Sequence, residues 1–364
     1  MHPLRILLGL MCSVSFSVSA AAPQTLRIFN DILFYDGYAA KVSEPIADGV
    51  LRHRNDLYAR PLTEQELLGI GSTLTAHVTI KAACDNYDRI GNINLALVPK
   101  GSVAYSPEQV ARIELGRFIT PFMNKNLKPD AVPYSFQLDH VAAVLNDAAL
   151  HKAYDFWVEL EVFGVPYAAQ NEVAGCAGRN DVFYGSLDFV SQNEPVAADQ
   201  AVLLPLNFKK NLNNYEAGAT DNLGQTVRTI AFDLPYAVRD ARFYLITSNH
   251  GANAGGEEYN RRVHDIFFDD QLVLSYKPGG VSCEPFRVYN TQGNGIYGRT
   301  PRTPEQWASF SNWCPGQAIP LRVIAVGDLA AGQHSFKISV PTAVFVEAQG
   351  YIPVSLYLQG HATP

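Results

Sequence analysis

Residues 73–80 read Thr-Leu-Thr-Ala-His-Val-Thr-Ile, an alternation of polar and apolar side chains. Successive side chains of a β-strand point to opposite faces, so this stretch would bury one face and leave the other in water. The same pattern recurs at residues 156–163, 227–232 and 335–340. We therefore expect the fold to be built from half-buried strands.

The rest of the chain supports an all-β class. Helix signals are short: a capping box begins at Thr63, and a cap residue precedes proline at Ser106 and Thr303. Many short strands separated by turn residues are typical of sandwiches and jelly rolls. Further strand patterns occur at residues 26–34, 93–98, 111–122, 182–190, 201–208, 241–247, 265–276, 321–326 and 354–358.

The N-terminus predicts export. Residues 1–5 are basic, residues 6–18 are mostly apolar, and small residues end at Ala20. This pattern is typical of a signal peptide, so residues 1–20 are excluded from the fold and the protein is expected to be periplasmic or secreted. No later segment has an apolar run of about twenty residues, so we expect no membrane association.

Charge and length bound the class of protein further. The net charge is -7, and losing Arg5 with the signal peptide makes it -8, which argues against nucleic acid as a partner. The remaining length favours two domains. The polar, proline-containing segment at residues 192–199 is the best boundary, giving domains at 21–192 and 199–364.

Four cysteines remain after the signal peptide: Cys84, Cys176, Cys283 and Cys314. An even number in an exported chain favours disulfides, and four cysteines allow three pairings. A Cys283–Cys314 bridge would close a loop rich in Gly, Pro and polar residues, and Cys84–Cys176 would then follow. No C-x-x-C spacing or adjacent His suggests a zinc site at these cysteines.

Two familiar signals carry little weight. Residues 293–298 match G-x-G-x-x-G but lie in a loop, whereas a nucleotide fingerprint needs a strand before it and a helix after it. His264 and Asp265 could orient each other, but a structural role for this His is favoured. Neither feature predicts a site.

Asp85 and Asp88 form the first candidate site, beside Tyr87 and Arg89. An Asp held near Arg stays ionised, and an ionised Asp at a strand end suits a general base or an orienter of water. The alternative is a loop salt bridge. On the residues alone that alternative is favoured.

Glu159 and Glu161 form the second candidate, on one strand face with Trp157 and Phe163. Acids among aromatic side chains suit sugars, which present hydroxyls at their edges and C–H groups on their faces. A solvent-exposed strand face is an equally good interpretation.

The glycine-rich loop at residues 251–262 is the third candidate. Glycines let the backbone approach a ligand closely, and Glu257, Glu258 and Tyr259 follow them. The alternative is a surface loop whose acids are compensated by its two arginines.

Together these stretches resemble the peptide:N-glycosidase F (PNGase F) family. The matching segments occur in the same order, at residues 84–89, 115–122, 161–163, 258–264 and 313–316. The most specific match is residues 115–122, Leu-Gly-Arg-Phe-Ile-Thr-Pro-Phe. The resemblance implies two antiparallel eight-stranded jelly rolls packed side by side, with the active site at their interface.

The resemblance also implies the reaction. The family cleaves the amide between the innermost N-acetylglucosamine and Asn of N-glycosylated proteins or peptides, converting Asn to Asp without a cofactor, and a monomer is expected. Asp88 corresponds to the essential acid, Glu258 to a carboxylate working with water, and Glu161 to one holding the chitobiose core. Arg89 would orient Asp88. The cleft would be lined by Tyr87, Phe163, Tyr259 and Trp313.

Several positions depart from the family pattern. The cysteine expected just before Cys84 is missing, Asn260 stands where another cysteine is expected, and Phe310 replaces an arginine. Tyr87, Phe163 and Tyr259 replace tryptophans, which would widen the cleft. Two alternatives therefore stay open: an endoglycosidase cutting within the chitobiose core, and a non-catalytic glycan-binding protein.

Overall fold

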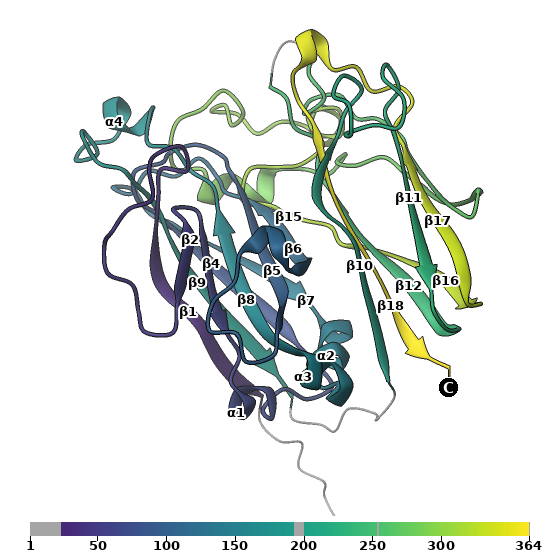
Figure 1. The fold of residues 1–364 in the computed structure, drawn as a ribbon. Helices are drawn as coiled ribbons and strands as arrows, with labels where there is room; N and C mark the ends of the chain where they lie inside the picture. The colour runs from purple at the N-terminus through teal and green to yellow at the C-terminus, as the bar shows by residue number, and fades with distance from the viewer. Residues whose placement is uncertain (1–22, 193–199, 253–254, 364) are drawn as a thin grey trace, which may run out of the picture.

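The computed structural model describes residues 23–192, 200–252 and 255–363. The expected signal peptide and most of the expected domain boundary, residues 193–199, lie outside the described residues. The described sheets consist of antiparallel strands, arranged as two sandwiches side by side (Figure 1). The all-β prediction is therefore confirmed. Among the described residues, no helix is both long and apolar enough to cross a membrane.

The N-terminal sandwich has the strand order of a jelly roll. Its strands are β1 Gln24–Tyr35, β2 Leu51–Arg54, β3 Leu57–Pro61, β4 Thr75–Ala82, β5 Ile90–Pro99, β6 Ala111–Ile119, β7 Ala131–Gln137, β8 Tyr154–Val162 and β9 Asp181–Ser191. One sheet runs β1-β9-β4-β7 and the other β6-β5-β8-β3-β2. When the short edge strand β2 is left out, eight strands remain. They pair from the ends of the chain inward: β1 with β9, β3 with β8, β4 with β7, and β5 with β6. This pairing is that of a long hairpin folded over into two sheets.

The C-terminal sandwich repeats this arrangement. Its strands are β10 Ala201–Leu212, β11 Val227–Leu234, β12 Val238–Thr247, β13 His264–Phe268, β14 Gln271–Tyr276, β16 Arg322–Leu329, β17 Gly332–Ser339 and β18 Ile352–Ala362. The sheets run β10-β18-β12-β16 and β11-β17-β13-β14, the same inward pairing. Each sandwich encloses its own apolar core.

Helices are short, as the sequence predicts. They are α1 Glu64–Leu67, α2 Asp139–Leu145, α3 Ala148–Ala153, α4 Ala169–Glu172 and α5 Pro304–Ala308, with 3₁₀ turns at Pro107–Gln109, Glu284–Tyr289 and Val346–Ala348. The caps at Thr63 and Thr303 are both capping boxes, which confirms those two predictions. One strand prediction is wrong: residues 265–276 form a hairpin, because Asp269 and Asp270 both take positive φ in a two-residue turn.

Strand β6 joins the two sandwiches. The two-residue strand β15, Ala318–Ile319, comes from the C-terminal half and pairs with β6 at Phe118 and Arg117 (Figure 1). A buried apolar cluster of Ile119, Ile246, Trp313 and Ile319 covers the same junction. The junction is thus held by backbone pairing and by side-chain packing.

A buried ion pair lies on β6 at this junction. Arg117 and Glu114 have no solvent exposure, and the guanidinium binds both carboxylate oxygens, at 2.8 and 2.7 Å. Arg117 also donates to the Ser248 hydroxyl and the Pro353 carbonyl, both at 2.8 Å, and Ser355 donates to Glu114. The pair therefore carries hydrogen bonds from one sandwich to the other.

Removing one member of this pair should destabilise the protein strongly. An unpaired buried charge costs about 3–5 kcal/mol, so Arg117→Met should lower the free energy of unfolding by about that amount in urea denaturation. The double variant Glu114→Leu/Arg117→Met should recover much of the loss. The control Lys337→Met breaks an exposed pair with Asp270 and should cost less than about 1 kcal/mol. A loss for Arg117→Met no larger than the control would contradict this account.

Candidate active site

Asp85 organises the loop between β4 and β5. Its carboxylate accepts from the backbone N–H groups of Tyr87 (2.9 Å) and Val165 (2.7 Å) and from Arg89 Nε (2.6 Å). With these bonds, the buried Asp85 is fully engaged in holding the loop. We assign it a structural role.

Arg89 binds Asp85, whereas we expected it to orient Asp88. The guanidinium also lies over the ring of Tyr87, at 5.1 Å from its centroid. The reason is local: Asp85 is four residues away and turned inward beneath the loop. The charge of Arg89 still favours the ionised form of Asp88 through space.

The ionisation of Asp88 differs from the sequence-based expectation. Burial, reinforced by the nearby Glu258 carboxylate, raises the pKa of Asp88 to about 7, and Arg89 offsets this only in part. An Asp expected to be permanently ionised therefore titrates near neutral pH. Groups poised in this way can both take up and release a proton.

Glu258 reaches the same place from the C-terminal sandwich. Its backbone carbonyl accepts from Asn312 N (3.1 Å), Asn312 Nδ2 (2.8 Å) and Ser311 Oγ (3.1 Å). Burial raises the pKa of Glu258, while hydrogen bonds from Tyr259 and from Gly251 N–H oppose the rise. Both carboxyls of the site thus hold protons more tightly than usual.

The neighbouring acid, Glu257, is structural. It is fully buried, binds Arg262 at 3.0 Å, and accepts from Val344 N at 2.7 Å. These bonds pin the described part of the 251–262 loop to the sandwich. Residues 253–254 of this loop lie outside the described residues.

Asp88 and Glu258 line one cleft of about 320 Å³ between the sandwiches. Five other predicted residues line it as well: Tyr87, Arg89, Phe163, Tyr259 and Trp313. The cleft also contains three residues that no sequence signal singled out: Tyr38, His250 and Tyr351. Burial beside Arg117 lowers the pKa of His250 to about 3, so this His is neutral and is no source of protons at neutral pH.

Glu161 lies in an adjoining cavity, also of about 320 Å³. It is joined to the Asp88 cleft through shared walls at Tyr38, Ile90, Phe163 and Tyr351. Burial favours the neutral acid, but Lys209 and Arg54 outweigh it and hold the pKa of Glu161 below its usual value. Glu161 is therefore an ionised acceptor beside the cleft.

Glu159, the other acid on β8, is fully buried away from this cavity. It accepts from Tyr105 Oη (2.6 Å), Asn94 Nδ2 (3.0 Å) and Arg112 Nη1 (3.3 Å). Asn94 and Arg112 lie on the neighbouring strands β5 and β6, and Tyr105 lies in the loop that joins them. Of the two carboxylates, only Glu161 is among the lining of the described cavities.

Aromatic rings form much of the cleft wall. Phe163 packs edge-on against Tyr38 (5.1 Å between centroids), and Tyr259 packs against Phe310 (5.8 Å). Trp313 is buried and fixed by its Nε1 hydrogen bond to the Asn249 carbonyl, at 2.9 Å. Rings with one face free suit the C–H faces of sugars.

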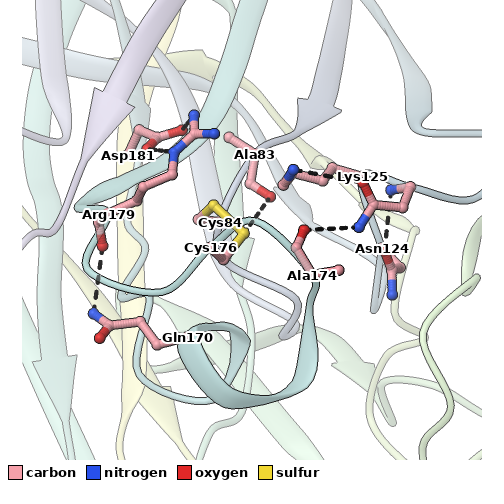
Figure 2. Close-up of a disulfide and its surroundings, with 10 residues drawn as sticks. Ala83, Cys84, Asn124, Lys125, Gln170, Ala174, Cys176, Arg179 and Asp181 are labelled. Atoms are coloured by element: carbon pink, nitrogen blue, oxygen red, sulfur yellow. Dashed lines mark hydrogen bonds and ion pairs between the residues drawn. A yellow bond between two sulfur atoms is a disulfide. The ribbon is translucent and has the colours of Figure 1, made fainter.

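Two disulfides brace the site, in the pairing predicted: Cys84–Cys176 and Cys283–Cys314. Figure 2 shows the first, which ties the start of the Asp88 loop to the segment that follows α4. Asn86 strengthens this link by donating to Glu172 of α4 at 2.7 Å. The long-range bridge thus anchors the loop that lacks the family's local one.

No group of three or more His, Cys, Asp or Glu side chains is placed to hold a metal ion within the described residues. The arrangement can instead move protons through two coupled carboxyls and present an ionised acceptor and aromatic faces nearby. These features define a tandem jelly-roll protein with a carboxylate-bearing cleft between its sandwiches.

Family models match both halves of the chain. Residues 25–177 match "Peptide-N-glycosidase F, N terminal", and residues 218–359 match "Peptide-N-glycosidase F, C terminal". The chain therefore belongs to the peptide-N-glycosidase F family, as the sequence resemblance predicted. No curated protein matches it.

Solved structures show the same fold. A structure of PNGF-II is similar at a TM-score of 0.66 and 19% identity, covering 94% of this chain and 66% of that one. This chain thus spans slightly under two thirds of PNGF-II. PNGase F, a glycosylasparaginase from Flavobacterium meningosepticum, is similar at a TM-score of 0.56 and 15% identity, covering 94% and 97%.

The raised pKa of Asp88 predicts a pH-dependent gain of stability on substitution. An unfolded Asp releases its proton near pH 4, whereas folded Asp88 holds its proton up to about pH 7, so its ionisation destabilises the fold as pH rises. Asp88→Asn should raise the Tm by roughly 2–6 °C at pH 8 and by less at pH 5.

The matched control is Asp85→Asn, which weakens bonds that hold the loop and should lower the Tm at both pH values. Thermal unfolding by circular dichroism measures both variants. An equal shift for Asp88→Asn at pH 5 and pH 8 would contradict the assigned pKa.

Proposed function

We propose that this protein is an exported amidase acting on N-glycosylated proteins or peptides. It would hydrolyse the bond between the innermost N-acetylglucosamine and Asn, converting Asn to Asp. The observation that carries the proposal is the placement of Asp88 and Glu258, one from each sandwich, in a single cleft with raised pKa values. Membership of the N-glycanase family supports it.

Two coupled carboxyls suit amide hydrolysis. Near neutral pH, mutual repulsion favours one protonated and one ionised member of the pair. The ionised carboxylate takes a proton from water as the water oxygen attacks the amide carbon. The protonated carboxyl gives its proton to the leaving nitrogen, and the C–N bond breaks. The products are Asp and a glycosylamine, which a second water converts to the free sugar and ammonia.

The three carboxyls Asp88, Glu258 and Glu161 would have different roles in this reaction. Following the family resemblance, we assign Asp88 to the reacting amide and Glu258 to the attacking water. Glu161, held ionised by Lys209 and Arg54, would accept hydrogen bonds from hydroxyls of the core sugars. Phe163 lines both the Glu161 cavity and the Asp88 cleft and would pack against a sugar face, as would Trp313 in the cleft. Tyr87 and Tyr259 would line the cleft around the reacting amide.

The proposal predicts that Asp88→Asn stays folded but loses turnover by roughly 10²–10⁴-fold, because an amide cannot exchange protons with the substrate. Activity is measured on one defined glycopeptide, with products identified by mass spectrometry. The exposed Asp48→Asn serves as the matched control and should retain full activity.

The product masses separate the candidate functions. An amidase leaves Asp on the peptide, whereas an endoglycosidase leaves one sugar on Asn. Binding without any product would indicate a glycan-binding protein. An Asp88→Asn variant that keeps most of its turnover would refute the assignment of Asp88.

A further inference from the structure

A further cavity, separate from the Glu161 cavity, also adjoins the Asp88 cleft. This cavity measures about 460 Å³ and shares Tyr87, Phe122 and Tyr259 with the cleft. None of these three lines the Glu161 cavity. The cleft that holds the reacting carboxyls is therefore flanked by two cavities. We name the cavity that contains Glu161 the Glu161 arm, and the cavity that shares Phe122 with the cleft the Phe122 arm.

We propose that the Phe122 arm binds the polypeptide that carries the glycosylated Asn. This inference rests on the proposed function. The bond to be cleaved joins a sugar to a protein, so glycan and polypeptide must leave the reacting amide in different directions. With the glycan in the Glu161 arm, the polypeptide occupies the other arm.

The chemistry of the Phe122 arm fits an extended peptide. Tyr87 is 48% exposed and Tyr259 is 37% exposed, so both offer ring faces to side chains. Asn86 also lines this arm, and its Oδ1 is buried without a hydrogen-bond partner among the described residues. A buried acceptor is costly unless a donor reaches it, and a peptide N–H would supply one.

The outer wall of this arm is held together by hydrogen bonds within the protein. Residues 290–292 of the C-terminal half align with residues 122–124 of the N-terminal half through four hydrogen bonds of 2.9–3.0 Å: Phe122 N to Asn290 Oδ1, Asn124 N to Thr291 Oγ1, Gln292 N to the Phe122 carbonyl, and Asn124 Nδ2 to Gln292 Oε1. A preformed wall lowers the ordering cost of binding.

Residues 293–296 of the glycine-rich stretch extend this wall, and the stretch supplies the test. Gly293 and Gly295 line the arm, whereas Gly298 is absent from its lining. A Cβ at Gly295 or Gly298 meets no atom within 4 Å, and neither residue has a positive φ. Gly295→Trp would therefore fill the arm without backbone strain, and Gly298→Trp is its matched control.

Binding is measured by isothermal titration calorimetry in the Asp88→Asn background, so that no ligand is consumed. The two ligands are a glycopeptide with several residues on each side of Asn and the same glycan released from the peptide. Gly295→Trp should weaken glycopeptide binding at least about tenfold, relative to Gly298→Trp, and leave glycan binding unchanged.

The outcomes separate this inference from the proposed function. Equal glycopeptide affinity for the Gly295→Trp and Gly298→Trp variants, with glycan still bound, would overturn the Phe122 arm alone. Weakened binding of the free glycan in Gly295→Trp would show that the arm holds sugar and would also overturn it. Failure of the Asp88→Asn parent to bind either ligand would overturn both proposals.

Discussion

Arg117 and Glu114 form an ion pair without solvent exposure, which also hydrogen-bonds to Ser248, Pro353 and Ser355 of the other sandwich. Asn92 of the same sandwich donates to Glu114 as well. Such a pair is stable only when every partner is in place, so it fixes how the two sandwiches dock. The same strand continues to Thr120, which accepts from Arg89 N–H and donates to the Tyr87 carbonyl. One strand therefore positions both the docking contact and the Asp88 loop.

Docking matters because the two carboxyls that line the cleft, Asp88 and Glu258, belong to different sandwiches. Asp88 lies on the loop after β4, and Glu258 on the loop after β12. Burial in the cleft, reinforced by the nearby Glu258 carboxylate, makes ionisation of Asp88 less favourable and raises its pKa into the range where proton transfer near neutral pH is useful. The free energy that docking supplies is partly consumed in holding these acids close, as is typical of active sites.

Local pattern predicted most of the sheets. Alternation at residues 73–80 became β4, and turn chemistry accounts for the hairpin at Asp269 and Asp270 that strand periodicity overlooked. Strand β7 escaped prediction because Pro133 argues against a strand interior; β7 lies at a sheet edge, where proline is tolerated. Such exceptions depend on where a strand sits in its sheet, which local sequence does not encode.

The site was predicted unevenly for the same reason. The segments bearing Asp88, Glu161 and Glu258 stood out through composition and family resemblance. Tyr38, His250 and Tyr351 carried no signal, because they enter the cleft only through docking. Arg89 binds Asp85 and not Asp88 because the loop turns Asp85 inward, which local sequence likewise does not encode.

Docking of the two sandwiches places the Glu258 carboxylate where it raises the pKa of Asp88. Titration of the Asp88 carboxyl carbon by NMR tests it most directly, in the wild type, in Glu258→Gln, and in the exposed control Glu305→Gln. We expect a pKa of about 7 for Asp88 in the wild type and in the control, and a lower pKa in Glu258→Gln, where the repelling charge is gone. A wild-type pKa near the ordinary value of about 4, or one unmoved by Glu258→Gln, would contradict it.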